Sequence, residues 1–231
     1  MNSLVLSLFP GIGLFDHAFE KEGFCVVRGP DLLWGGDIRF FHPPPIFDGI
    51  IGGPPCQGFS PIGNLNRTRW GDDSVMPDMI PEFRRVVDEV EPRWWVMENS
   101  IYAYAPKDDA HEVTLDTLWL GERQSRRRRF WSNVNLQKYL PPFPALVGVD
   151  AGTERTVSGQ GSVDWKGSRG REKRRSLGDM LELQGFPSDM LDDCPMTSSG
   201  AKKAVGNGVP FVMGTAIAKA ITFWELANAD R

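Results

Sequence analysis

The sequence predicts an α/β fold in which a doubly wound, mostly parallel sheet of the Rossmann-like type carries a small loop-rich lobe. Short apolar runs typical of buried strands alternate with segments of helical periodicity. Three of these runs lead into residues suited to ligand binding or chemistry, namely Gly11, Cys56 and Glu98. Because ligands of such sheets lie beyond the carboxyl ends of the strands, these three residues are expected at one edge.

The first strand and helix are predicted on either side of a glycine turn. The run Ser3–Leu8 is apolar, and Leu14–Glu22 has helical spacing with Gly23 as a C-cap. Between them, Gly11 and Gly13 allow the backbone to approach a ligand, and the following helix N-terminus favours negative charge. A plain tight turn explains these glycines equally well, so this segment alone does not identify a site.

The next two strands are predicted at Ile46–Ile51 and Trp94–Met97, with a helix at Met79–Val90 between them. Four apolar residues of that helix recur at helical spacing on one face, and Pro92 ends it. Strand, helix and strand in this order form the unit from which parallel sheets are built.

The rest of the chain is predicted to complete the sheet and to carry the lobe. Strands are expected at His111–Leu120 and Phe130–Val134, on either side of a run of arginines. Pro141–Arg175 is rich in Gly, Ser, Pro and Arg without periodicity, which predicts loops, and helices follow at Leu177–Leu183 and Pro210–Asn228. The expected organisation is a sheet domain at 1–130, a loop-rich region at 131–175 and a C-terminal part at 176–231 that returns to the sheet domain.

The composition is that of one globular domain with an uneven charge distribution. At 231 residues, with 41% hydrophobic and 24% charged residues, the chain can bury one sizeable core. Its net charge is −4, yet residues 123–175 hold 13 Lys and Arg against 4 Asp and Glu. An acidic body with one basic region is the usual footprint of a phosphate-binding face, although a solvated surface run has the same composition.

Cysteine content and hydropathy exclude several classes of protein. Cys25, Cys56 and Cys194 lie far apart without a CxxC pair, so neither a zinc site nor a disulfide framework is expected. Free thiols suit a reducing cytoplasm. Leu4–Phe9 lacks the basic flank of a signal peptide, and no apolar run approaches the roughly 18 residues of a membrane span. We therefore expect a cytoplasmic protein with no metal ion and no membrane partner.

Cys56 and Glu98 are the candidate reactive residues. Two prolines before Cys56 fix the backbone at the end of a strand and present the thiol stiffly. A buried structural cysteine is the common alternative, but glycine and proline are poor packing partners for one. Glu98 follows an apolar strand, where a carboxyl group is expected to have a raised pKa, as a proton donor requires. An exposed loop acid is the alternative there.

Four consecutive arginines, Arg126 to Arg129, form the densest charge in the sequence. If the segment is extended, residues 124, 126 and 128 share one face and residues 127 and 129 share the other. One set then reaches into a site while the other holds phosphate. A solvated strand face is the alternative interpretation.

Together and in this order, these segments resemble the motifs of the cytosine-C5 DNA methyltransferase family. The resemblance covers most of the chain and is weak at Pro141–Arg175. Each string is modest, but six in the family's order are specific. The segments are Phe9-Pro10-Gly11-Ile12-Gly13, Pro54-Pro55-Cys56-Gln57, Glu98-Asn99-Ser100, Gln124-x-Arg126-x-Arg128, Leu183-Gln184-Gly185-Phe186-Pro187 and Gly206-Asn207-Gly208-Val209.

The resemblance implies a DNA (cytosine-5-)-methyltransferase with the fold of methyltransferases that depend on S-adenosyl-L-methionine (AdoMet). It also implies that 1–130 is the catalytic domain that binds AdoMet and that 131–175 is a reduced target-recognition region. Cys56 would add to C6 of a flipped-out cytosine, which makes C5 nucleophilic enough to accept a methyl group. Glu98 would hold or protonate N3, Arg128 would contact O2, and Arg126 would support the cysteine side of the pocket.

The resemblance also implies which residues bind the cofactor and DNA. Asp31 is similar to the acid that binds the ribose, and Asp37 with Ile38 resembles the pair that reads the adenine. The implied cofactor residues are Phe9, Pro10, Gly11, Ile12, Gly13, Asp31, Asp37, Ile38, Pro54, Asn207 and Val209. The expected contacts to double-stranded DNA are Gln57, Ser60, Gln124, Arg127, Arg129, Arg169, Arg171, Lys173, Arg174 and Arg175.

The chain departs from the family pattern in several places. Only five residues separate Asp31 from Asp37, where the family has a whole helix, so either Asp31 is wrongly assigned or that helix has been lost. Arg123 stands where the family has proline, and Ser100 replaces valine. The recognition region, Phe130 to Arg175, is only about 45 residues long, which predicts a minimal reader whose loops are held on phosphates.

Two alternatives stay open at this point. The same scaffold acting on RNA, or with an alkyl donor related to AdoMet, requires few changes. A catalytically inactive homologue that only binds DNA or cofactor is the other, and the intact Cys56, Glu98 and Arg126/Arg128 argue against it. A small enzyme of this kind suits a restriction-modification or phage setting in a bacterial cell, and we expect a monomer.

Overall fold

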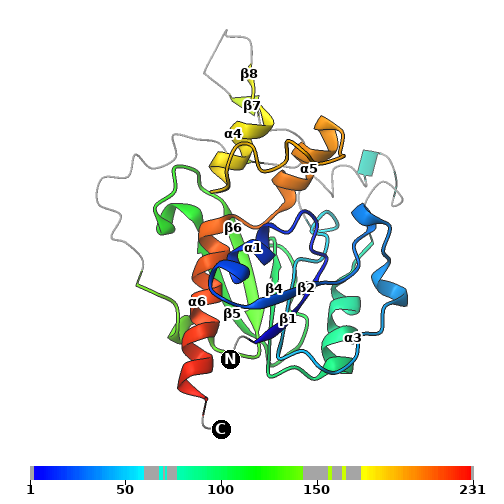
Figure 1. Ribbon diagram of the computed structural model, residues 1–231, viewed down its shortest axis with the longest axis vertical. Coiled ribbons are helices and arrows are strands. Elements are labelled where there is room, and N and C mark those ends of the chain that lie inside the picture. Colours follow the sequence, from blue (N-terminus) through cyan, green and yellow to red (C-terminus); the bar gives the residue numbers. More distant parts are fainter. Residues whose placement is uncertain are drawn as a thin grey trace.

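The computed structural model describes residues 3–59, 68, 69, 71, 77–142, 156, 157, 163, 164 and 173–229. In this part of the chain a six-stranded mixed sheet is covered by helices on both faces (Figure 1). The predicted doubly wound, mostly parallel architecture is therefore confirmed. Much of the predicted recognition region, 131–175, lies outside the described residues.

The sheet has the strand order β2-β1-β3-β4-β6-β5. Its four parallel strands are β1 (Leu4–Leu8), β2 (Cys25–Arg28), β3 (Gly49–Gly52) and β4 (Trp94–Asn99). The other two, β5 (His111–Asp116) and β6 (Arg127–Ser132), pair antiparallel with each other, and β6 also pairs antiparallel with β4. This pairing sets Glu98 of β4 opposite Phe130 and brings the arginines of β6 beside the end of β4.

The two faces of the sheet are buried under different helices. Helices α1 (Leu14–Lys21) and α6 (Phe211–Ala227) share one hydrophobic cluster with Val5, whereas α3 (Ile80–Val90) shares a second cluster with Leu6. Neighbouring strand residues point to opposite faces, which explains why Val5 and Leu6 belong to different clusters. Burial on both faces of the sheet is also why β1, β3 and β4 are continuous apolar runs in the sequence.

The connection between β2 and β3 is short and irregular. All its residues are described, and it contains only the two 3₁₀ turns η1 (Leu32–Trp34) and η2 (Ile38–Phe40). Asp31 and Asp37 cap these turns, since their carboxylates accept hydrogen bonds from the backbone of Leu33 and Arg39. Of the two alternatives for this segment, the structure agrees with the loss of the helix.

Three predicted boundaries change in the structure. β3 begins at Gly49 rather than at residue 46, and β6 begins at Arg127 rather than at residue 130, so three of the arginines belong to the strand. β5 ends at Asp116, because this side chain caps the 3₁₀ turn η4 (Thr117–Leu120) by accepting from Leu118 N at 3.1 Å.

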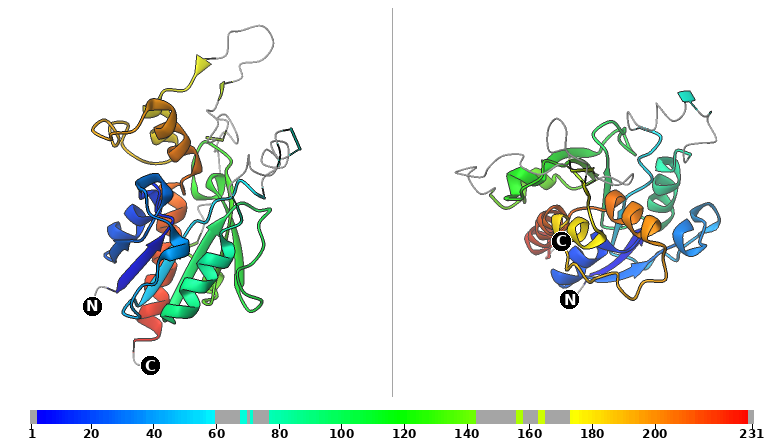
Figure 2. Two further views of the ribbon diagram at one scale, coloured as in Figure 1. Left: turned by 90° about the vertical axis from the view of Figure 1, so that its right-hand side faces the viewer. Right: turned by 90° about the horizontal axis from the view of Figure 1, so that it is seen from above.

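The C-terminal part adds two helices beyond the carboxyl ends of the strands (Figure 2). Helix α4 (Leu177–Leu183) was predicted, but α5 (Ser198–Asn207) was missed. Its sequence begins Ser-Ser-Gly and has no broad apolar face, so tertiary contacts and the Thr197 cap on Gly200 N stabilise it. The pair β7 (Val163–Asp164) and β8 (Lys173–Arg174) lies outside the main sheet (Figure 1).

Within the described residues, no single helix has both the length and the hydropathy needed to cross a membrane, while α5 and α6, bent by 43° at their junction, pass that test only as a pair.

Candidate active site

A cavity of about 440 Å³ opens at the carboxyl ends of β1, β3 and β4. This volume lies in the range of small-molecule sites, roughly 300–1,000 Å³. Its wall includes Gly11, Cys56 and Glu98, which come from three separate strand ends. The expected convergence of these segments on one edge of the sheet is therefore found in the structure.

The segment after β1 forms one wall of the cavity with backbone that turns sharply. Phe9 and Gly11 have φ values of 56° and 55°, in the left-handed region. Phe9, Pro10, Gly11 and Ile12 line the cavity, and a Cβ built on Gly11 meets no described atom within 4 Å. Glycine at this position therefore leaves open space where a ligand can approach the backbone.

Gly13 was predicted to bind the cofactor, and this contact stays a prediction, because Gly13 is not among the residues that line the described cavity. Gly13 caps α1 with a φ of 79° and does not belong to the cavity wall. A Cβ there would lie 2.3 Å from Arg28 Nη2, whose side chain pairs with buried Asp16 at 2.9 Å. The helix entry and this close approach both require a glycine at this position.

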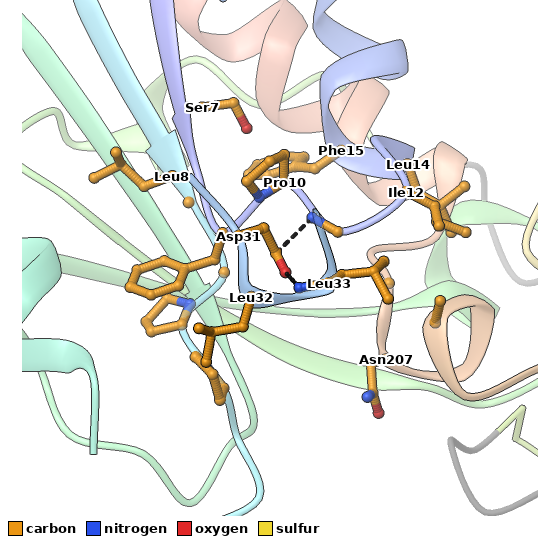
Figure 3. Close-up of a pocket in the computed structure, with 18 of the residues that line it drawn as sticks. Ser7, Leu8, Pro10, Ile12, Leu14, Phe15, Asp31, Leu32, Leu33 and Asn207 are labelled. Carbon is orange, nitrogen blue, oxygen red and sulfur yellow. Dashed lines mark hydrogen bonds between the residues drawn. The ribbon is translucent and has the colours of Figure 1, made fainter. Parts of the chain in front are cut away.

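Asp31 lies in the cavity wall between the glycine turn and η1 (Figure 3). Its Oδ2 accepts from Gly11 N at 2.9 Å and its Oδ1 accepts from Leu33 N at 2.8 Å. Trp34 Nε1 donates to Gly11 O at 2.7 Å, so η1 is fastened to the glycine turn from both directions. Each carboxylate oxygen retains a second lone pair, which can accept from a ligand hydroxyl.

Asp37 and Ile38 line the cavity from η2. Ile38 is buried against α3, and Asp37 forms an ion pair with Arg39 at 2.6 Å. Hydrogen bonds from Arg39 lower the pKa of Asp37, so this carboxyl is ionised at neutral pH. The turn thus offers an acceptor and an apolar side chain next to each other.

Helix α5 forms the opposite wall with residues that the sequence analysis did not identify. Asn207 and Val209 line the cavity as predicted, and Asn207 approaches it from the end of α5 (Figure 3). Gly200, Lys203 and Ala204 also line it. Lys203 and Ala204 lie three and four residues from both Gly200 and Asn207, and this spacing is the signal of one helical face that could have revealed them.

The end of β4 holds the loop that carries Cys56. Asn99 is buried, and its Nδ2 donates to Pro54 O at 3.0 Å while its Oδ1 accepts from Ser100 N at 2.8 Å. Cys56 is partly exposed toward the cavity, and burial raises the pKa of its thiol. The charges of Arg128 and Arg126 act in the opposite direction on this pKa, so they reduce the cost of forming the thiolate.

Glu98 is the most deeply buried acid of the cavity wall, with 5% of its surface exposed. Burial raises the pKa of Glu98, in agreement with the prediction, and the charge of Arg128 acts in the opposite direction. Arg128 Nε lies 2.8 Å from Glu98 Oε1, an ion-pair distance. Apart from this ion pair, no described donor satisfies Oε1.

The arginines of β6 divide between two faces, as the extended segment predicts. Arg128 points into the cavity wall beside Glu98. Arg127 pairs with Asp116 at 3.3 Å and Arg129 pairs with Glu112 at 3.1 Å. Their predicted contact with DNA remains a prediction, because Arg127 is largely exposed but both guanidinium groups already have carboxylate partners.

Arg126 is buried and does not belong to the cavity wall. Its guanidinium donates to Val157 O at 2.5 Å, to Gly206 O at 2.9 Å and to Gly208 O at 3.0 Å. Burial lowers the pKa of Arg126 to about 9, which still leaves it charged at neutral pH. Arg126 therefore holds the end of α5 against β6 and acts on Cys56 only through its charge.

Two predicted DNA contacts are contradicted by burial. Gln124 is fully buried, with its amide nitrogen donating to Leu183 O and its amide oxygen accepting from Val157 N. Arg175 is only 4% exposed, so its side chain does not present charge to a nucleic acid. Gln57 lines the cavity. Ser60, Arg169 and Arg171, and the side chains of Lys173 and Arg174, lie outside the described residues.

The raised pKa of Glu98 predicts how stability depends on pH. Above the ordinary value of 4.5 an unfolded chain releases this proton, while the folded protein keeps it up to its higher pKa. The stabilisation is complete below 4.5 and is lost as pH rises toward the folded pKa, so the free energy of unfolding falls with a slope of up to about 1.4 kcal/mol per pH unit. Urea unfolding across this window is expected to show a shallower decline for Glu98→Gln, and parallel curves would contradict the prediction.

Comparisons with known proteins agree on one family. The description C-5 cytosine-specific DNA methylase matches residues 35–119, which include Cys56 and Glu98. The Type II methyltransferase M1.HphI of Haemophilus parahaemolyticus is 50% identical over 124 residues, covering 43% of this chain and 32% of that protein. M.FnuDI of Fusobacterium nucleatum, also a Type II methyltransferase, is 31% identical over 177 residues, covering 61% of this chain and 50% of that protein.

The chain spans about a third to a half of the length of these curated relatives. Among solved structures, the Entamoeba histolytica methyltransferase EhMeth matches with a TM-score of 0.65 at 11% identity, over 100% of both chains. At so low an identity the likeness concerns the fold alone, and it agrees with the sheet and helices described above.

Proposed function

We propose that this chain is a member of the C-5 cytosine-specific DNA methylase family, whose description matches residues 35–119, and that it transfers a methyl group from AdoMet to C5 of a cytosine in DNA. One observation carries the proposal: Cys56, Glu98 and Arg128 line the same cavity as the glycine turn and Asp31. A thiol, a carboxyl group and a guanidinium at one end of a cavity of this size are the groups that methylation at C5 requires.

The cavity wall fits AdoMet at several points. The open space above Gly11 allows a ligand to contact the backbone, and Asp31 retains lone pairs for ribose hydroxyls. When bound, AdoMet supplies a methyl group on a positively charged sulfur. The residues that would hold it are Phe9, Pro10, Gly11, Ile12, Asp31, Asp37, Ile38, Pro54, Asn207 and Val209.

Cys56 makes the cytosine reactive. The thiol gives up its proton, the sulfur forms a bond to C6, and the electron pair of the C5–C6 double bond moves to C5, which becomes the nucleophile. After methylation the proton on C5 leaves to a base, the double bond re-forms and the carbon–sulfur bond breaks. The charges of Arg128 and Arg126 lower the cost of the thiolate at the start and at the end of this cycle.

Glu98 limits the negative charge that builds on the cytosine ring when the thiolate adds to C6. Burial keeps its carboxyl group protonated to higher pH, so it can donate to N3 of the cytosine. Its Oε1, which no described donor satisfies, is available to a donor on the base. Arg128 lies next to this carboxyl and is suited to contact the neighbouring carbonyl oxygen of the base.

The depth of the site supports base flipping. Glu98 is almost fully buried and Cys56 is recessed in the cavity wall, so a cytosine stacked within a duplex cannot reach both groups. Extruding the base costs a few kcal/mol, which contacts in the pocket must offset.

Methyl-labelled AdoMet and mixed-sequence duplex DNA test the proposal directly. After incubation with the full chain, digestion of the DNA to nucleosides is expected to give label in 5-methyldeoxycytidine, and sequencing of the modified positions then gives the recognition site. RNA of the same sequence forms the second arm. Label in RNA alone, or label on another base or another position of cytosine, would overturn the proposal.

A further inference from the structure

The turn η2 is held from the helix layer beneath it in addition to the Asp37 cap at its start. It carries Asp37 and Ile38 into the cavity wall, yet it belongs to a connection without an α-helix. Arg85 of α3 reaches its backbone: Nη2 donates to Ile38 O at 2.7 Å and Nη1 donates to Phe41 O at 3.1 Å. One guanidinium thus bridges the two ends of the turn.

We propose that Arg85 is a positioning residue for the cofactor. By binding both carbonyl oxygens it fixes η2 where Asp37 and Ile38 contact the ligand. The inference rests on the proposed function, in which that ligand is AdoMet. Arg85 lies outside the cavity wall, and it holds η2 in a connection that has no α-helix to do so.

Two acidic residues of the same helix orient the guanidinium. Arg85 Nε lies 2.8 Å from Glu82 Oε2, and Nη1 lies 2.7 Å from Glu89 Oε1. Arg85 is 26% exposed, so these pairs are partly shielded from water. A planar guanidinium with fixed donor directions keeps both remaining bonds aligned on the two carbonyl oxygens, which a lysine ammonium cannot do.

Helix α3 is a rigid base for this contact. Phe83, Val86 and Val87 are buried against the sheet, and Ile38 belongs to the same cluster. A backbone carbonyl in an irregular segment needs a donor, and a charged donor forms the stronger bond. Loss of Arg85 leaves the Ile38 side chain in the core, so we expect the fold to persist while Asp37 loses its fixed orientation.

The test compares Arg85→Gln with Arg84→Gln. Arg84 is the neighbouring residue on α3, is 61% exposed, and pairs with Asp88 at 3.6 Å on the helix surface. For Arg85→Gln, calorimetry is expected to show a Kd for AdoMet raised about 5- to 30-fold, with KM for AdoMet raised equally. At saturating AdoMet, kcat and KM for DNA are expected to stay within about twofold of the wild type. Arg84→Gln is expected to match the wild type, and Arg85→Lys to recover part of the affinity.

The outcomes separate the inference from the proposed function. A wild-type protein that binds no AdoMet overturns the proposed function and, with it, the role of Arg85. If the wild type binds AdoMet and Arg85→Gln binds it equally well, the positioning role is wrong and the proposed function stands. A parallel loss of thermal stability, kcat and affinity for DNA in Arg85→Gln, with no recovery in Arg85→Lys, would also overturn the inference, because it would mark a purely structural role.

Discussion

Replacement of Cys56 by alanine is expected to lower the rate of methyl transfer to DNA by at least about 10⁴-fold, because Cys56 carries the only thiol in the described cavity wall. Binding of AdoMet is expected to change little, since Cys56 and Glu98 mark the chemical end of the cavity and Asp31 lies at the glycine turn. Transfer of labelled methyl groups and calorimetric binding measure the two quantities separately.

The other cysteines provide matched controls. Cys25 is exposed on β2 and Cys194 follows α4, and neither lines the cavity. Alanine at either position is expected to keep the wild-type rate within about twofold. Duplex DNA with 5-fluorocytosine adds a second readout, because fluorine at C5 cannot leave as a proton and the adduct should persist. A covalent complex formed by the Cys56→Ala variant would contradict the assignment of the nucleophile.

The second large effect is expected for Glu98→Gln, with kcat lowered about 10²- to 10⁴-fold. Glutamine keeps the size of the side chain and can still accept from Arg128, but it cannot transfer a proton to N3. We expect AdoMet affinity to be retained, so the loss should appear in single-turnover rates at saturating AdoMet and DNA.

Glu112→Gln is the matched control for Glu98→Gln. Glu112 pairs with Arg129 of the same strand β6, as Glu98 pairs with Arg128, but it is half-exposed and lies outside the cavity wall. Its replacement is expected to leave single-turnover rates within about twofold of the wild type. Equal losses in both variants would show that any carboxylate paired with the β6 arginines matters, and the role of Glu98 as a proton donor would be wrong.

Much of the cavity wall could be predicted because its residues follow local rules. Gly11, Cys56 and Glu98 each come directly after a short apolar run, and in a parallel sheet all such positions meet at one edge. The alternation along β6 likewise separates Arg128 from Arg127 without any tertiary information. Asp31 lines the cavity although its surroundings depart from the family pattern, and its contact with the ribose stays a prediction.

The sequence by itself determined the class of fold, the candidate reactive residues and the edge of the sheet where they meet, since apolar periodicity and residue type act over a few neighbouring positions. Only the tertiary structure decided which polar groups face the cavity and which are used to hold it together. Arg126 and Gln124 find their partners near residues 206 and 183, and Arg85 finds its partners near residue 38. Such long-range hydrogen bonds depend on how distant segments pack, and a buried donor must take whichever acceptor that packing brings to it.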